Sequence, residues 1–211
     1  MKIALINENS QAPKNKLIFD TLKDVAEPLG HTCVNYGRYS ADDPHERTYV
    51  QAGILAGILL NSGAVDFVIT GCGTGEGGLL ACNAQPNVLC GYVVEPCDAY
   101  LFRQINNGNA ISMPFAKGFG WGAELNLRNV FEKLLAKEPG GGYPPEWAAA
   151  EHNNKLVLDG VKTAACRDYL DALRAYDKKL VKGAVAEESF PEMFFPACKK
   201  PEIAEYVRSL L

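Results

Sequence analysis

Three side chains that can do chemistry, Cys72, Thr74 and Glu76, stand at alternate positions of the glycine-rich segment GCGTGEGG (71–78). The segment directly follows the apolar run VDFVIT, which is typical of a buried strand. A thiolate or a carboxylate can take a proton from carbon, and a hydroxyl can donate a hydrogen bond. Glycines have no Cβ atom and leave backbone N–H groups open to a ligand. The segment is therefore a candidate site either for a cofactor's phosphates or for a small substrate held against a reactive side chain.

The position of Cys72 just before an expected helix favours acid–base chemistry, because amides at a helix N-terminus stabilise a thiolate. The same amides can stabilise negative charge that develops during a reaction. Glu76 is a second candidate base, although an acidic residue in a first helical turn often only offsets the helix dipole. Thr74 can cap the helix, donate its hydroxyl to a substrate, or do both. The glycines whose amides surround this position are Gly71, Gly73, Gly75 and Gly77.

Residues 73–78 also satisfy the G-x-G-x-x-G pattern of dinucleotide-binding loops, and Glu95 ends the next apolar run. Three features weigh against this interpretation. The loop follows the third expected strand and not the first, Pro96 follows Glu95 directly, and the chain leaves no separate substrate domain. Dinucleotide binding is therefore a minor alternative.

Short apolar runs alternate with helix-length amphipathic segments over the first two thirds of the chain. The expected strands are 2–7, 31–37, 66–71, 88–95 and 110–115, and the expected helices are 16–30, 49–62, one that includes 79–82, 99–105 and 121–137. This alternation predicts an α/β fold, a Rossmann-like three-layer α/β/α arrangement with a five-stranded parallel sheet. Ligands of such sheets bind beyond the carboxyl ends of the strands, where the glycine-rich segment lies.

The Pro/Gly-rich stretch EPGGGYPPEW (138–147) ends the alternation. We therefore divide the chain into a Rossmann-like domain at residues 1–137 and a linker with a mainly helical C-terminal extension at residues 138–211. The extension is too short for a second catalytic domain, so we expect it to pack on the first domain or on a neighbouring subunit. Its apolar residues at helical spacing are Cys166, Tyr169, Leu170, Leu173 and Leu180, and then Ile203, Tyr206, Val207 and Leu210.

Composition argues against several classes of partner. The 211 residues carry a formal net charge of −4 with scattered basic residues, so binding to a nucleic-acid backbone is not expected. No segment approaches the about 20 apolar residues that cross a bilayer, so no membrane association is expected. Seven cysteines without a CxxC pair predict free thiols in the cytoplasm and no zinc site.

Four ordered motifs carry a family resemblance. They are Asp42-Asp43-Pro44-His45, GCGTGEG (71–77), ACN (81–83) and VVEPCDAYLFRQINNGNA (93–110). Together they resemble the motifs of the ribose-5-phosphate isomerase type B and galactose-6-phosphate isomerase family, over residues 1–137. The resemblance implies an aldose–ketose isomerase that acts on a sugar phosphate through an enediolate, without a cofactor or a metal. It also implies a homodimer or homotetramer with shared active sites.

The resemblance implies roles for the matching residues. The cysteine at the position of Cys72 moves the proton between neighbouring carbons, while the loop amides and the threonine at the position of Thr74 stabilise the enediolate. Some members use a glutamate at the position of Glu76, so the identity of the base is open, and Cys72 is preferred. Asn106 matches an asparagine that binds substrate hydroxyls from a neighbouring subunit. Lys117 can replace a phosphate-binding arginine.

The chain departs from the family at the residues that open sugar rings. Ile105 stands where the family has a histidine, and Asn7-Glu8 stands where it has Asp-His. The substrate is expected to be a sugar phosphate of the ribose 5-phosphate type or, because an imidazole proton shuttle is missing, a shorter open-chain sugar phosphate or an unusual sugar.

Three other polar residues are candidate substrate contacts. His45 can take over ring opening or be a solvated bystander, and Asn7 and Glu8 remain candidate substrate contacts. A catalytically silent sugar-phosphate sensor is the alternative function.

Overall fold

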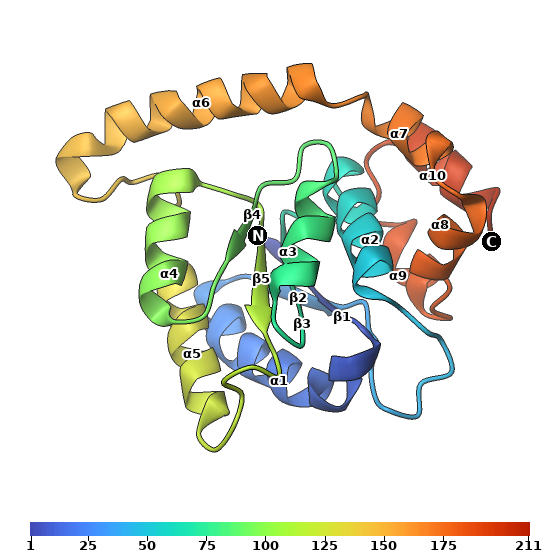
Figure 1. Cartoon of the computed structure of the whole chain (residues 1–211), viewed down its shortest axis with the longest axis horizontal. Coiled ribbons are helices and arrows are strands. Elements are labelled where there is room, and N and C mark those ends of the chain that lie inside the picture. The colour runs from blue at the N-terminus through green and yellow to red at the C-terminus, as the bar shows by residue number, and fades with distance from the viewer.

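The centre of the structure, a computed structural model of residues 1–211, is a parallel sheet of five strands in the order β2-β1-β3-β5-β4. All five strands run in one direction, so their carboxyl ends meet at one edge, the lower edge of the sheet in Figure 1. The strand bounds are β1 Lys2–Asn7, β2 Thr32–Asn35, β3 Phe67–Cys72, β4 Cys90–Tyr92 and β5 Ala110–Pro114.

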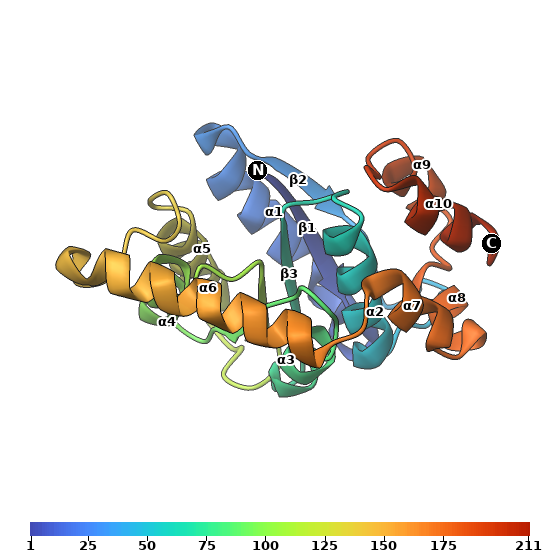
Figure 2. The ribbon, with the colours of Figure 1, turned by 90° about the horizontal axis from the view of Figure 1, so that it is seen from above.

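Helices cover both faces of the sheet (Figures 1 and 2). Successive strand residues point to opposite faces, so Leu5 packs into the core on one face and Ile6 into the core on the other. The predicted three-layer α/β/α fold with a five-stranded parallel sheet is confirmed. The first face is covered by α1 (Asn15–Ala26), α4 (Pro96–Leu101) and α5 (Ala123–Leu134), and the second by α2 (Tyr49–Asn61) and α3 (Glu76–Asn83).

Several elements are shorter than predicted, and hydrogen bonding explains where α1 and β4 end. Helix α1 ends at Ala26 and continues only as a 3₁₀ turn, Glu27–Leu29, because Pro28 has no N–H group for the helical ladder. Strand β4 has three residues and not eight, because the Asp98 carboxylate accepts hydrogen bonds from the backbone N–H groups of Val94 and Glu95, at 2.9 and 3.1 Å. These bonds start α4 early, at Pro96.

The C-terminal extension begins with α6 (Ala148–Ala165), which crosses the amino edge of the sheet at the top of Figure 1. The predicted single apolar stripe from residue 166 to 180 is divided between two helices, because Asp177 caps a new helix through a hydrogen bond from the N–H of Lys179. None of the helices is long and apolar enough to cross a membrane. The four helices that follow α6 lie beside α2: α7 (Tyr169–Ala175), α8 (Lys178–Ala184), α9 (Phe190–Phe194) and α10 (Pro201–Arg208).

The extension and the sheet share one hydrophobic core. A cluster of 25 buried residues joins strand residues such as Val68 to extension residues such as Leu173. Phe190 stacks on Phe194 with 4.8 Å between the ring centroids and meets Tyr36, at the end of β2, at 6.2 Å. The extension therefore folds against the second face of the domain and adds a layer outside α2.

We expect Phe194→Ala to lower the free energy of unfolding by about 3–5 kcal/mol, the usual cost of removing a buried phenyl ring. Because the core is shared, the whole chain should still unfold in one transition, measured by urea titration with far-UV and near-UV circular dichroism. Leu211→Ala, at a side chain that is 48% exposed, is the control and should change little. A first transition that removes the extension and spares the sheet would contradict the shared core.

Candidate active site

The glycine-rich loop leaves the sheet at the carboxyl edge, between β3 and α3. Asn7 pairs in register with Gly71, and Cys72 with Pro114, so the ends of three neighbouring strands meet around Cys72. In a parallel α/β sheet this edge is where ligands bind. The structure thus brings the predicted Cys72, Thr74, Glu76 and loop glycines together at one edge.

The sulfur of Cys72 lies at the N-terminus of α3. The backbone N–H of Gly75 donates a hydrogen bond to Sγ at 3.2 Å, and the hydroxyl oxygen of Thr74 is 3.9 Å from the same sulfur. Gly75 caps the helix with φ +82°, a conformation that residues with a side chain rarely adopt. A donated N–H and the positive end of the helix both stabilise negative charge on the sulfur.

The two candidate bases differ in exposure. Cys72 is 9% exposed, whereas Glu76 and Thr74 are exposed at the first turn of α3. Tyr49, which was not predicted as a site residue, lies beside the loop at Gly77. Its ring carbons are 3.2 Å, and Cys72 Sγ is 3.5 Å, from the point where a Cβ atom on Gly77 would stand.

Hydrogen bonds fix the loop to the strands beside it. The Ser112 hydroxyl donates to the carbonyl of Gly75 at 2.6 Å, and the Tyr92 hydroxyl donates to the carbonyl of Thr74 at 2.9 Å. The backbone N–H of Lys117 donates to the carbonyl of Gly73 at 2.8 Å. Lys117 is therefore beside the loop of its own chain, with an exposed side chain, and its binding of a phosphate stays a prediction.

The side chains of Asn7 and Glu8 support the turn that follows β1. The Asn7 amide is buried and donates to the carbonyl of Gln11 at 3.0 Å. The Glu8 carboxylate accepts from the N–H and the hydroxyl of Ser10, at 2.9 and 2.5 Å, and so caps the 3₁₀ helix Asn9–Lys14. Both residues lie at the carboxyl edge, and their contact with substrate stays a prediction.

The same 3₁₀ helix carries a cation that the sequence analysis missed. The ammonium of Lys14 donates to Gln11 Oε1 at 2.9 Å and to the carbonyl of Phe115, and it lies 4.8 Å from the ring centroid of Phe119. Gln11 Nε2 in turn lies 3.8 Å from the point where a Cβ on Gly73 would stand. The 3₁₀ helix has no apolar periodicity in its sequence. Only its position directly after β1 could have indicated that Lys14 lies near the site.

His45 belongs to a charged cluster, and Asn106 lies at the opposite edge of the sheet from the loop. His45 Nδ1 is 3.4 Å from a carboxylate oxygen of Asp43 and 3.6 Å from one of Glu187, in the segment between β2 and α2. Asn106 ends the π-helical turn Phe102–Asn106, before β5 and therefore at the amino edge. At about 3.3 Å per residue, the five residues of β5 alone separate the two edges by roughly 13 Å. Asn106 cannot contact substrate at Cys72 of its own chain.

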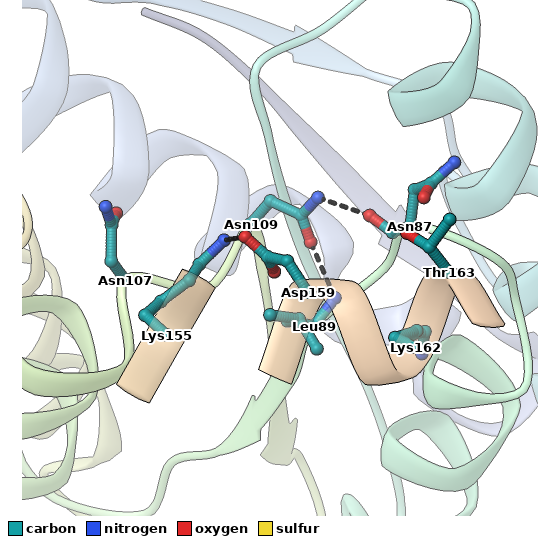
Figure 3. Close-up of a pocket in the computed structure, with 8 residues that line it drawn as sticks. All are labelled: Asn87, Leu89, Asn107, Asn109, Lys155, Asp159, Lys162 and Thr163. Atoms are coloured by element: carbon teal, nitrogen blue, oxygen red, sulfur yellow. Dashed lines mark hydrogen bonds and ion pairs between the residues drawn. The ribbon is translucent and has the colours of Figure 1, made fainter. Parts of the chain in front are cut away.

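A polar pocket of about 290 Å³ lies at this amino edge, under α6 (Figure 3). Lys155 and Asp159 form an ion pair at 2.5 Å on its α6 side, and the Asn109 amide donates to the carbonyl of Asn87 at 2.8 Å on the other. Because β5 separates it from Cys72, this pocket is not part of the same chain's glycine-loop site. The residues that line it are Asn87, Leu89, Asn107, Asn109, Lys155, Asp159, Lys162 and Thr163.

Comparisons with known proteins bear on this site. The sequence profile of the ribose/galactose isomerase family matches residues 3–136, and a second profile, described as ribose-5-phosphate isomerase, matches residues 164–210. No curated protein matches the chain. The predicted family resemblance is confirmed by the first profile, and the second shows that the extension is itself a recognised segment.

Two solved structures match over the whole chain. A 4-deoxy-L-threo-5-hexosulose-uronate ketol-isomerase complexed with a tartrate is 53% identical, with a TM-score of 0.98 over 100% of this chain and 99% of that chain. The ribose-5-phosphate isomerase of Vibrio parahaemolyticus is 56% identical, with a TM-score of 0.97 over the same shares. The type B ribose 5-phosphate isomerase of Trypanosoma brucei is 18% identical and shares the fold, with a TM-score of 0.64 over 76% of this chain and 97% of that chain.

Proposed function

Because the chain belongs to the ribose/galactose isomerase family and is an aldose–ketose isomerase, we propose that its substrate is an open-chain aldose with a terminal anionic group. The observation that carries the proposal is the site itself. A thiol that accepts a backbone hydrogen bond stands at the carboxyl edge, while Ile105 occupies the position of the family's ring-opening histidine.

Isomerisation needs one base that reaches two neighbouring carbons. The Cys72 thiolate removes a proton from the carbon beside the aldehyde, and the electrons of the broken C–H bond form the enediolate. Amides of the glycine loop and the Thr74 hydroxyl stabilise the oxygen that gains charge. The thiol then returns the proton to the former aldehyde carbon. The hydroxyl proton of the neighbouring carbon passes to the former aldehyde oxygen, so the aldehyde becomes a CH2OH group and the hydroxyl-bearing carbon becomes the ketone. No electron acceptor is needed because one carbon is oxidised as its neighbour is reduced.

The chemistry of an open-chain substrate fits the missing imidazole. A hexose closes a five- or six-membered ring through its hydroxyl at C4 or C5. The relative named 4-deoxy-L-threo-5-hexosulose-uronate ketol-isomerase has a substrate with no oxygen at C4 and a ketone at C5. Such a molecule stays linear, and an enzyme for it needs no acid–base group to open a ring. We propose the same 4-deoxy-5-keto hexuronate for this chain.

Cations near the loop suit the terminal anion. Lys117 lies beside Gly73, and Lys14 lies beside Gln11, without a carboxylate partner for either ammonium. Lysine binds a carboxylate or a phosphate as a compact point charge. Ribose 5-phosphate is therefore a second candidate substrate, favoured by the name of the 56% identical relative.

We expect kcat/KM for the 4-deoxy-5-keto hexuronate to exceed that for ribose 5-phosphate by about 10²–10⁴-fold, the usual contribution of one acid–base group, which only the ring form requires. Product formation from both compounds at matched pH measures the ratio. Efficient turnover of ribose 5-phosphate alone would contradict the open-chain proposal. Tight binding of either compound without turnover would favour the silent sensor.

We expect Cys72→Ala to lower kcat by about 10²–10⁴-fold, because it removes the base. Glu76→Gln should change kcat much less, because its exposed carboxylate lies in solvent at the first turn of α3. Exchange of the substrate C–H proton with deuterated solvent reports the proton transfer directly. The opposite ranking of the two variants would assign the base to Glu76.

We further propose that the chain is a homodimer in which α6 forms part of the interface and Asn106 completes the partner's site. Helix α6 has no buried residue, and its exposed side chains include Leu156, Val157, Leu158 and Val161, which are 46–59% exposed. Val157, Leu158 and Val161 are neighbours on this helix at i+3 and i+4 spacing, and an exposed apolar patch of this kind often marks a protein interface. The distance between Asn106 and Cys72 within one chain supports the shared site.

We expect Val161→Asp to shift the protein from dimer to monomer and to reduce kcat/KM, because it places a charge in the apolar interface. Light scattering coupled to size-exclusion chromatography measures the mass. The matched control is Leu125→Asp on α5, where the side chain is 63% exposed, similar to the 59% of Val161. A wild-type monomer with full activity would contradict both the dimer and the shared site.

We also propose a domain boundary and a cellular location for this protein. The boundary between a domain at 1–137 and an extension at 138–211 is supported by the family match, which ends at residue 136. A cytoplasmic location is supported by the seven cysteines, all of which are free thiols.

A further inference from the structure

The C-terminal extension meets the active-site edge at one charged cluster. Asp43, His45 and Arg47 come from the segment between β2 and α2, and Glu187 comes from the link between α8 and α9. The side chains of Arg47 and Glu187 are 2% and 7% exposed, with 3.8 Å between Nη2 and Oε2. The other carboxylate oxygen of Glu187 lies 3.6 Å from Nδ1 of His45.

The charges of the cluster indicate an ionic connection and not a metal site. The separations between His45 and the two carboxylates also suit metal ligands. However, Arg47 already faces Glu187, and the Asp43 carboxylate already accepts hydrogen bonds from the backbone N–H groups of Tyr39 and His45, at 3.1 and 3.0 Å. A divalent ion would leave an excess positive charge in a mostly buried place.

The members of this pair depend on each other because both are buried. Burial lowers the pKa of Arg47, and the nearby Glu187 carboxylate raises it. Burial raises the pKa of Glu187, and the Arg47 guanidinium lowers it. Removing either partner leaves a buried charge without compensation, which is more costly than losing the pair as a whole.

Arg47 connects this pair to the ends of β1 and β2. Its Nη1 donates to the carbonyl of Tyr36 at 2.6 Å. Its backbone N–H donates to Oδ1 of Asn9 at 2.5 Å, and the N–H of Asn9 donates back to the carbonyl of Arg47 at 2.9 Å. The guanidinium therefore fixes a backbone position that is itself bonded to the turn after β1.

The segment that Arg47 fixes leads directly to the glycine loop. Thr48 caps α2, and Tyr49 is the first residue of that helix. The Tyr49 ring and the Cys72 sulfur both lie within 3.5 Å of the point where a Cβ atom on Gly77 would stand. A shift of the backbone at Arg47 would move both Asn9 and Tyr49 relative to the sulfur.

We infer that Glu187 is a positioning residue for the Cys72 site: by holding Arg47, the C-terminal extension fixes the segment that places Tyr49 beside the glycine loop and that is bonded to Asn9 in the turn after β1. The kinetic consequence rests on the proposed function, whereas the effect on the geometry of the pocket does not. The extension is then part of the active-site scaffold and not only a cover for α2.

The first test needs no substrate. The rate at which iodoacetamide alkylates Cys72 is measured by mass spectrometry of the modified peptides. In Glu187→Gln this rate should rise by about tenfold, because local opening of the site becomes about ten times more frequent. Cys97, which is exposed, is the internal standard in the same molecule and should not change. Glu188→Gln, at the exposed neighbouring residue, is the matched control. Equal Cys72 reactivity in Glu187→Gln and Glu188→Gln would overturn the inference.

The second test separates positioning from stability. Glu187→Gln should lower kcat/KM for the open-chain aldose by about tenfold to a hundredfold, as for a misplacement of about 1 Å in a site. Glu187→Asp, which keeps the charge, should recover part of the loss.

The double variant Arg47→Met, Glu187→Leu leaves no unpaired buried charge and should regain thermal stability while Cys72 stays reactive. If it regains wild-type Cys72 reactivity as well, the pair is only structural and the inference fails. Should the wild type show no turnover, the alkylation result still decides the inference, and only the proposed function is lost.

Discussion

The active site depends on how closely the loop after β3 approaches β5. A Cβ atom on Gly71 would stand 2.3 Å from the carbonyl oxygen of Met113, and one on Gly75 would stand 2.8 Å from the backbone of Met113 and Pro114. Real Cβ atoms do not make such contacts. Because these residues have no side chain, the loop lies against β5, and the N–H of Gly75 turns toward the sulfur of Cys72. The glycines therefore serve the internal fit of the loop as much as access for a ligand.

The residues that replace the family's acid–base groups have been absorbed into structural hydrogen bonds. Asn7 belongs to a network with Asn15 and Asn35, whose side chains exchange hydrogen bonds at 2.6 and 3.1 Å. Glu8 caps the turn that follows. A side chain that satisfies buried backbone groups is not free to shuttle protons, because moving it would leave those groups unpaired. The carboxyl edge thus keeps the Cys72 thiol and lacks an imidazole at the position of Glu8.

The two edges of the sheet hold different candidate site residues. The carboxyl edge holds the thiol and the loop amides, whereas the amino edge holds Asn106, the polar pocket and α6. Parallel topology makes this separation unavoidable, since a strand must run between the end of one connection and the start of the next. Residues at opposite edges can act on one substrate only when two copies of the chain meet. The extension, by contrast, contacts its own chain. Phe190 packs against Tyr36, and Glu187 pairs with Arg47, so the extension holds the segment between β2 and α2 in place.

Local patterns determined much of this protein. The alternation of apolar runs and amphipathic segments was enough for the three-layer fold, and the glycine-rich segment at a strand end was enough to place Cys72, Thr74 and Glu76 at the ligand-binding edge. Both are properties of short stretches, in which period and residue type carry the information. The ends of elements were less predictable, because β4 stops where the Asp98 side chain competes for its backbone N–H groups. Only the tertiary structure brought Tyr49 to the glycine loop, Lys14 to Phe115 and Glu187 to Arg47. These contacts join residues that are 28 to 140 positions apart in the chain, and no local pattern encodes a contact made at such separation.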